Sequence, residues 1–484
     1  MMKRKLCIIF LLLFACLQVT FAKSKEKPLD MSLRDAVVLA LRYNASVVVE
    51  DYQRIVDKFS LKVALWQYDI QYSLTGAASY TQAISGGIRS ENDSASLTPG
   101  ATLLLPLGTQ LSLSWVNPLA HTVGSPRFYN PSVVFNATQP LLKGFGPDVT
   151  LAPLYQAENT ELINRLNMQN IVINTITTVI GQYAAVSSAK NNLKVTQASL
   201  DQSLKILAQQ KALLKAGRIA SADLVQFEAS AASQKLQLEQ AEVSYVQEER
   251  ALLITLGIDP AITLNVTENV HLPTEDVKPL EECIQIALEN NIVYQQALIN
   301  LKNARIALTV NADAERPTLN ASITQTQGGG SGGEPNDGLG SIVNGANRNT
   351  MLGLTLSVPI NDLSLQQGYL NAKIALKQQE IQLDQLKRTV INDVINAYYT
   401  VLNQKEQIKQ AELSVKLAQQ SVDIANAKLK YGKVSAFEAS TLQTNLLSAQ
   451  VSYINTVTAY VTNLATLDQT IGITLDRWCV KLRY

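Results

Sequence analysis

Two stretches decide how this chain folds: "KALLKAGRIASADLVQ" at residues 211–226 and "NAKLKYGKVSAFEAST" at residues 426–441. Each interrupts a long helical pattern with one glycine, Gly217 in the first and Gly432 in the second. Glycine adopts the left-handed conformation that ends a helix without strain. We therefore expect each stretch to be the reversal of a helical hairpin.

The residues after each glycine have the features of a helix start. Ser221 and Ser435 are candidate N-caps, because a hydroxyl accepts a hydrogen bond from the first free backbone amides. Asp223 and Glu438 would lie in the first turns, where the helix dipole favours a carboxylate.

The helices that lead into the two glycines contain the same heptad pattern, 215 positions apart in the sequence. Apolar residues recur every seven positions, which predicts long helices packed as in a coiled coil. Residues from about 150 to 213 would make a helix of about 95 Å. The pattern consists of Val186, Leu193, Leu200, Leu207 and Leu214 in the first half, and Val401, Ile408, Val415, Val422 and Leu429 in the second.

An internal repeat extends beyond the hairpins. "LRDAVVLALRYN" at 33–44 aligns with "LEECIQIALENN" at 280–291, 247 positions later. The fall from 247 to 215 gives the first half 32 more residues, most of them before Pro140. Each half therefore predicts a helix, then strands, then two very long helices.

The strands are expected where the sequence alternates and is rich in Tyr, Ser and Thr. The first half has candidates at 68–83, at 101–115 around a Pro-Leu-Gly-Thr turn, and at 131–142. The second half has 317–327 and 350–360, with a polar, glycine-rich loop between them. At the C-terminus, "RWCVKLRY" resembles a barrel-insertion signal, or else a short strand equivalent to "AITLNV" at 261–266; we favour the second interpretation.

The N-terminus is typical of a secretory signal, with Lys3 to Lys5 before an apolar core and a cleavage site after Ala22. The alternative is a lipid anchor at Cys16. Cleavage leaves Cys283 and Cys479, which are too few to predict a disulfide framework. The charges, 41 Lys and Arg against 40 Asp and Glu, give no indication of a nucleic-acid partner.

An enzyme is not expected from these residues. The two histidines, His121 and His271, belong to no metal-ligand spacing, and "KGFG" at 143–146 lacks the ending of a phosphate loop. We therefore predict no catalytic residues, no bound metal and no cofactor.

The sequence resembles the TolC-like outer-membrane factor family in three paired features. These are the two helix starts, the two glycine tips, and the corners "QPLLKGFG" (139–146) and "SVPIND" (357–362). The resemblance covers nearly the whole mature chain. It implies an α+β membrane protein with a tandem duplicated repeat, a few-stranded share of a trimeric outer-membrane β-barrel, and long periplasmic coiled-coil hairpins.

The predicted domains are a signal peptide at 1–22 and two repeats. The first repeat would span 23–270, with strands at about 66–142 and a helical hairpin at about 148–256. The second repeat would span 271–484, with strands at about 317–360 and a hairpin at about 364–472.

The resemblance implies four strands per protomer in a shared twelve-stranded barrel within outer-membrane lipid. The extra segment near 95–117 is a departure: it either adds a hairpin to the barrel or lies outside the wall. The residues matching the strand-to-helix corners are Gln139, Pro140, Gly144, Gly146 and Pro359.

The resemblance also implies roles for the tips. Glu438 matches the first acid of a cation-sensitive entrance ring, whereas Thr441 replaces the second acid and leaves a weaker ring. Asp223 matches a residue that holds the closed state, but Val434 stands where its arginine partner would be, with Lys433 beside it. Adaptor docking is implied for the tips, with residues Gly217, Arg218, Ile219, Ala220, Ser221, Asp223, Gly432, Lys433, Val434 and Ser435.

The function implied is a passive exit duct joined through a periplasmic adaptor protein to an inner-membrane pump, for efflux or for one-step protein secretion. The alternative is a structural coiled-coil protein of the cell envelope without channel activity. The cargo, the pump and the adaptor are not specified by these residues.

Overall fold

The structure is a computed structural model that describes residues 29–123, 128–219, 221–267, 277–329, 335–345, 347–431 and 433–482. The expected signal peptide, its cleavage site and Cys16 lie outside these residues. The chain divides into two compact units. We call them the sheet unit (Val49–Ile173, Lys278–Asn396 and Thr470–Tyr484) and the helical unit (Met1–Val48, Asn174–Val277 and Ala397–Gln469).

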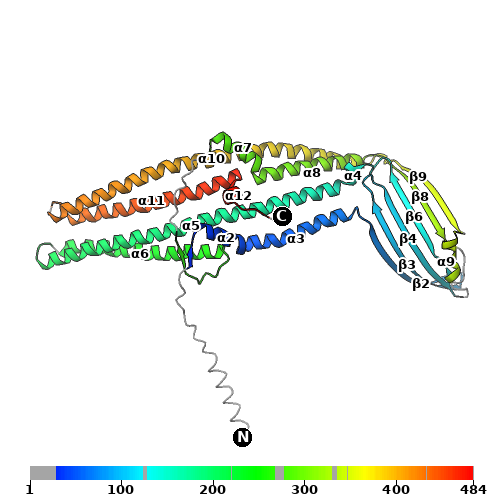
Figure 1. Cartoon of the computed structure of the whole chain (residues 1–484), viewed down its shortest axis with the longest axis horizontal. Helices are drawn as coiled ribbons and strands as arrows, with labels where there is room; N and C mark the ends of the chain where they lie inside the picture. The colour runs from blue at the N-terminus through cyan, green and yellow to red at the C-terminus, as the bar shows by residue number, and fades with distance from the viewer. Residues whose placement is uncertain are drawn as a thin grey trace, which may run out of the picture. The chain divides into compact units, whose positions relative to one another are not determined.

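The sheet unit contains one large antiparallel sheet, whose long strands lie side by side in Figure 1. Its spatial order is β2-β3-β4-β6-β8-β9, and the short β5 pairs with β4. The strands are β2 (Gln71–Ser85), β3 (Ile88–Leu104), β4 (Gln110–Thr122), β5 (Phe128–Tyr129), β6 (Ser132–Pro140), β8 (Thr318–Gly328) and β9 (Arg348–Ser357).

The segment near 95–117 therefore lies in β3 and β4, within the sheet. Among the described residues this sheet has six long strands in a row, whereas the resemblance implies four barrel strands per protomer.

Four helices of the sheet unit run next to one another in the order α3, α5, α8 and α10. Their bounds are α3 (Ala45–Trp66), α5 (Ala152–Lys215), α8 (Ile292–Ala314) and α10 (Leu363–Lys430). Arg54 of α3 binds Glu161 of α5, and Asn159 of α5 donates to Asn303 of α8 over 2.7 Å. The short helices of this unit are α4 (Pro147–Thr150), α7 (Leu280–Asn290), α9 (Pro335–Asn344) and α12 (Thr474–Arg477).

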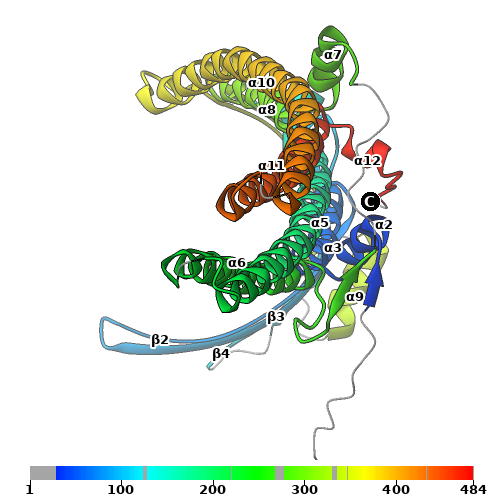
Figure 2. The same ribbon diagram turned by 90° about the vertical axis from the view of Figure 1, so that its left-hand side faces the viewer.

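The helical unit contains the remaining parts of α5 and α10, together with α2 (Leu33–Tyr43), α6 (Ser221–Thr255) and α11 (Ala436–Ile471). Figure 2 shows α6 beside α5 and α11 beside α10, as two hairpins. A two-stranded parallel sheet joins β1 (Leu29–Met31) to β7 (Leu264–Val266). The buried Tyr183 hydroxyl donates to the Met31 carbonyl over 3.1 Å and fixes this sheet to α5.

The heptad prediction is confirmed by burial. None of its ten apolar residues is exposed, and five are buried: Val186, Leu200, Val401, Ile408 and Val422. Among the described residues, α5 is the one helix long and apolar enough to cross a membrane, and 61% of that window is buried. Its apolar surface is therefore largely used for packing.

Each unit contains a similar contact at the end of a long hairpin. In the helical unit the Asn44 side chain donates to the Thr255 carbonyl over 2.7 Å, and Gly257 follows with φ +71°. In the sheet unit Asn291 donates to the Thr470 carbonyl over 3.1 Å, and Gly472 follows with φ +85°. At both glycines a Cβ atom would overlap a backbone carbonyl.

Two sequence expectations are wrong. The loop expected between the last two strands contains the helix α9, whose apolar residues Leu339 and Val343 lie one turn apart. The C-terminal stretch follows the single helical turn α12, and residues 478–482 form no strand. Cys479 there has φ +52°, outside the extended region that a strand requires. The expected strand within 261–266 is confirmed as β7.

Candidate channel wall and hairpin tips

The large sheet has one apolar face. Residues directly opposite each other in antiparallel strands point to the same side, so the register assigns every side chain to a face. We call this side the apolar face; it carries Tyr72, Leu74, Leu97, Leu103, Leu111, Leu113, Trp115, Val133, Phe135, Ile323, Leu352, Leu354 and Leu356. Such a continuous band facing outward is typical of a wall in contact with lipid.

The opposite side, here called the polar face, consists mainly of hydroxyl and amide side chains. Ser79 and Ser94, paired across β2 and β3, lie 2.8 Å apart through their hydroxyl groups. Other members are Ser73, Thr75, Ser96, Thr102, Ser112, Ser114, Asn136, Thr138, Ser322, Thr324 and Thr355. The sheet therefore separates an apolar environment from an aqueous one.

Charged residues of the sheet are confined to one end. The strands β2, β4, β6 and β8 contain no Asp, Glu, Lys or Arg. The charges of β3 lie beside its turn into β2, where Arg89 pairs with Glu91 at 2.5 Å and Asp93 lies 3.2 Å from His121. That end is suited to water, and it points away from the helices that precede β2 and follow β9.

The first strand-to-helix corner is a tightly packed turn. The Gly144 amide donates to the buried Asp313 carboxylate over 2.7 Å, and Pro140 ends β6. Gly108, with φ +92°, lies so close to Gly144 that a Cβ atom would overlap its carbonyl oxygen. Gln139 binds the Thr109 hydroxyl, which joins the same corner to the β3–β4 turn.

The corner prediction named Gln139, Pro140, Gly144 and Gly146. Gly146 has φ +101° and is the N-cap of α4, which begins at Pro147. It missed Asp313, because this residue is distant in sequence and no local pattern marks it as the acceptor.

The second corner, after β9, contains Pro359 and a capped helix start. Asp362 accepts backbone hydrogen bonds from Ser364 at 2.9 Å and Leu365 at 3.3 Å. The Ser364 hydroxyl also donates to this carboxylate, and these bonds lower the pKa of Asp362. Pro359 itself lies after the last strand residue, Ser357, where a missing amide leaves no ladder bond unmade.

The first tip reverses at Gly217, as expected. Gly217 has φ +71° and donates to the Leu214 carbonyl over 2.9 Å, while Arg218 donates to Leu213 over 2.9 Å. These two hydrogen bonds form a Schellman motif, in which a glycine in the left-handed conformation ends the helix. Arg218 is exposed, and Ile219 is half-buried.

The cap expected after this turn stays a prediction. Ser221 is the first residue of α6 as described, and Ala220 before it lies outside the described residues. Asp223 is in the first turn of α6, but its side chain also lies outside what the structure describes.

The second tip is capped as expected. The Ser435 hydroxyl accepts from the Glu438 amide over 3.1 Å, and α11 begins at the next residue. Glu438 is exposed in the first turn, whereas Thr441, one turn later, uses its hydroxyl to bind the Phe437 carbonyl at 3.0 Å. Lys433 is exposed and Val434 half-buried; Gly432 lies outside the described residues.

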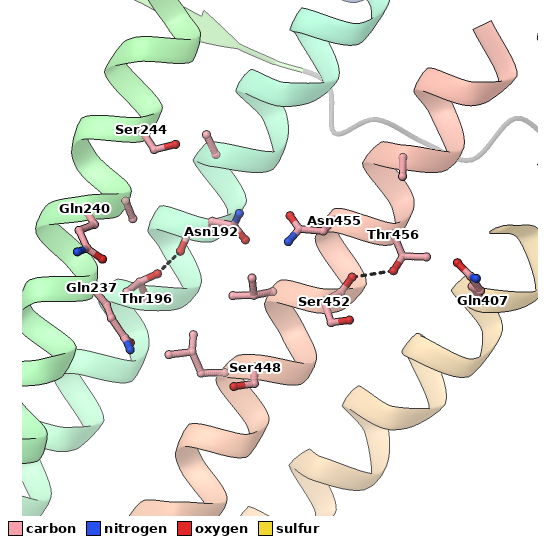
Figure 3. Close-up of a pocket in the computed structure, with 15 residues that line it drawn as sticks. Asn192, Thr196, Gln237, Gln240, Ser244, Gln407, Ser448, Ser452, Asn455 and Thr456 are labelled. Atoms are coloured by element: carbon pink, nitrogen blue, oxygen red, sulfur yellow. Dashed lines mark hydrogen bonds between the residues drawn. The ribbon is translucent and has the colours of Figure 1, made fainter. Parts of the chain in front are cut away.

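The two hairpins meet within the helical unit. The hydroxyl groups of Ser230 in α6 and Ser440 in α11 lie 3.4 Å apart. Further from the tips, α5, α6, α10 and α11 surround a hollow of about 820 Å³ (Figure 3). Its lining has no charged side chain and includes Asn192, Gln237, Gln240, Gln407, Ser448 and Asn455.

Sequence reasoning also missed a buried ion pair in the sheet unit. Both guanidinium nitrogens of Arg54 reach the Glu161 carboxylate, at 3.0 and 2.6 Å, and the two side chains are only 7% and 5% exposed. The hydrogen bonds from Arg54 hold the pKa of Glu161 below its ordinary value, despite the opposing effect of burial. Arg165 and Asp57 extend the pair into a four-residue network.

No group of His, Cys, Asp and Glu able to hold a metal occurs within the described ranges. His121 lies at the charged end of the sheet, and His271 lies outside those ranges.

Residues 89–257 and 283–473 match the family model described as outer membrane efflux protein, and these ranges make up well over half of the chain. The protein therefore belongs to the outer membrane efflux protein family, as the sequence resemblance implied. Membership places it in the cell outer membrane, with the long helices in the periplasm. A comparison with curated protein sequences gives no match.

Solved structures with a similar fold include outer-membrane proteins. The CmeC outer membrane channel of Campylobacter jejuni has a TM-score of 0.70 and 15% identity, covering 91% of this chain and 85% of that one. VceC of Vibrio cholerae has a TM-score of 0.69 and 14% identity, and the match covers 91% of this chain and 96% of that one. The open state of the MtrE channel of Neisseria gonorrhoeae has a TM-score of 0.67 and 14% identity, covering 91% of this chain and 88% of that one.

Proposed function

We propose that this protein is the passive outer-membrane exit duct of a tripartite export system. The observation that carries the proposal is the sheet with one apolar and one polar face. Such a sheet can stand between lipid and a water-filled lumen, and its charges lie at the end away from the helices.

The duct would be a homotrimer. A single copy exposes an apolar stripe on α3, formed by Tyr52, Ile55, Val56, Phe59 and Val63. Exposed apolar surface of this extent marks a contact with another chain. Within the sheet unit, α10 carries a second exposed stripe, which includes Leu363, Leu370, Ile374 and Ile381.

We also propose that the chain is a tandem duplicate, with repeats at 23–270 and 271–484 after a signal peptide at 1–22. The equivalent contacts of Asn44 and Asn291 with the last helical turns of their hairpins support this division. Gly257 and Gly472, where the chain passes within contact distance of another backbone, support it further.

The uncharged hollow among α5, α6, α10 and α11 supports an aqueous path. Its lining, which mixes amide and hydroxyl groups with apolar side chains, would pass hydrated solutes without holding ions of one sign. The energy for export would come from an inner-membrane pump, and the cargo would be chosen by that pump, whether small molecules or secreted proteins.

The tips would dock the periplasmic adaptor through the exposed Arg218 and Lys433. Gly217 would set the turn of the first tip, and Ile219, Val434 and Ser435 lie beside the two cations in sequence. Glu438 would form the entrance ring, one carboxylate per protomer, with Thr441 one turn further in. Phe437, exposed beside Glu438, is a further docking candidate.

The test is single-channel recording of the purified mature protein in planar lipid bilayers. We expect small openings that divalent cations block, and loss of that block in Glu438→Ala. Glu412→Ala is the matched control, because it removes an exposed carboxylate of α10 away from the tip and should leave the block intact.

Conductance with the same block in both variants would retain the channel and reject Glu438 as the entrance residue. A folded protein that neither inserts nor conducts would reject the duct and favour a structural coiled coil of the envelope.

A further inference from the structure

The outer strands of the large sheet, β2 and β9, have no neighbour on one side among the described residues. The edge of β2 is 15 residues long and contains no charged residue, and β9 has only Arg348. Proteins normally shorten, charge or cover such edges. These two edges therefore have the character of strands that pair with another chain.

The apolar face reaches both edges. Tyr72 and Leu74 on β2 are 80% and 68% exposed, and Leu352 and Leu354 on β9 are 76% and 70% exposed. Edge strands whose side chains face lipid would leave their free amides and carbonyls in the same apolar medium. Each such group costs several kcal/mol, so open edges do not occur there.

The strands β2 and β3 are built as part of the wall. They are paired through every residue of β2, from Gln71 opposite Thr102 to Ser85 opposite Ile88. The division into apolar and polar faces continues through them: Leu74 lies opposite Pro99, and Ala101 lies opposite Leu113 of β4. A hairpin lying in water outside the wall would not need this continuity.

The directions of the two edge strands are complementary. The strand β2 begins at Gln71, shortly after α3, and β9 ends at Ser357, shortly before α10. Both edges therefore have the same end next to the helices, and the strands run in opposite directions along them. In Figure 1 α3 leads into one edge and α10 leaves the other, so their exposed apolar stripes lie at the same two sides of the unit.

We propose that β9 of one protomer pairs antiparallel with β2 of the next, so that each copy contributes six strands to a closed barrel. This inference rests on the proposed trimer: three copies of six strands make a barrel of eighteen. Barrel diameter grows roughly linearly with strand number. The outer-membrane pore would be about 1.5 times as wide as one built from four strands per copy.

The rival arrangement keeps the hairpin β2–β3 outside the barrel and closes the wall between β4 and β9. Disulfide cross-linking distinguishes the two. In a Cys479→Ser background, Ser73→Cys on β2 is combined with Thr355→Cys or Ser357→Cys on β9, two positions that test the register. Ser114→Cys on β4 is the matched control, because Ser73 and Ser114 both lie opposite Gly100 on the polar face.

We expect oxidation to shift the Ser73 combinations from monomer to covalent trimer on denaturing gels, while the Ser114 combinations stay monomeric. Trimers from the Ser114 combinations alone would overturn the six-strand wall and keep the trimeric duct. A trimer by light scattering that cross-links in neither series would reject the β2–β9 contact. A monomer in detergent would reject this inference and the proposed trimer together.

Discussion

The buried pair of Arg54 and Glu161 gives the sharpest prediction about stability. Replacing Glu161 with Leu leaves a guanidinium that is only 7% exposed without its closest carboxylate. Removing one partner of a buried pair typically costs about 3–5 kcal/mol. Arg54 keeps a second contact, with Asp57 at 3.3 Å, so we expect the low end of that range, about 3 kcal/mol.

The measurement is hydrogen exchange of the α3 amides in detergent, because α3 is held to α5 by this pair. A loss of about 3 kcal/mol in local opening corresponds to exchange faster by roughly a hundredfold. The matched control is Arg165→Met, which removes the more exposed arginine from the same carboxylate and should cost less than about 1 kcal/mol.

The double variant Arg54→Met with Glu161→Leu replaces both charges by apolar groups, and such replacements are often neutral. We therefore expect its exchange to return towards that of the natural protein. Unchanged exchange in Glu161→Leu, or a double variant as labile as the single one, would refute the argument that the unpaired charge causes the loss.

The pH dependence of the pair has a definite sign. The hydrogen bonds that the Glu161 carboxylate accepts from Arg54 lower the pKa of Glu161 from an ordinary value of 4.5. The stabilisation is therefore complete above that value and is lost as the pH falls through the lower pKa of the folded state. After correction for the intrinsic rate of amide exchange at each pH, the protection of the α3 amides should fall in acid in the natural protein, and less so in the double variant.

Three further changes test other parts of the structure. Leu354→Lys puts a charge on the apolar face and should lower the stability of the protein in the membrane by about 2–4 kcal/mol. Thr355→Lys, on the polar face, should insert normally, and refolding yields in liposomes measure the difference. Gly257→Ala should abolish trimer assembly, as seen by gel mobility, because the new methyl group would overlap the backbone carbonyl of Tyr43. Gly217→Ala has free space around it and should lose only about 1–2 kcal/mol from its left-handed turn, as measured by hydrogen exchange. Asp313→Ala removes the carboxylate that accepts from the partly buried Gly144 amide and should cost about 1–3 kcal/mol, seen as a lower melting temperature.

The sequence by itself determined the family and the helical hairpins. Heptads, glycine turns and capping residues act within a few positions of one another, so Gly217, Ser435 and the buried positions of α5 and α10 could be predicted from local pattern. It also indicated most of the strands, because alternation is a property of a single strand. The missed helix α9 lies in a loop, where several local conformations are close in energy.

Tertiary structure alone decided what depends on distant residues. The Asp313 carboxylate caps Gly144, and Arg54 meets Glu161 more than a hundred positions away; neither pair has a local signal. The place of the segment near 95–117 was decided in the same way. Strand pairing is a long-range choice, and the register that puts β3 and β4 within one sheet exists only when their neighbours are present.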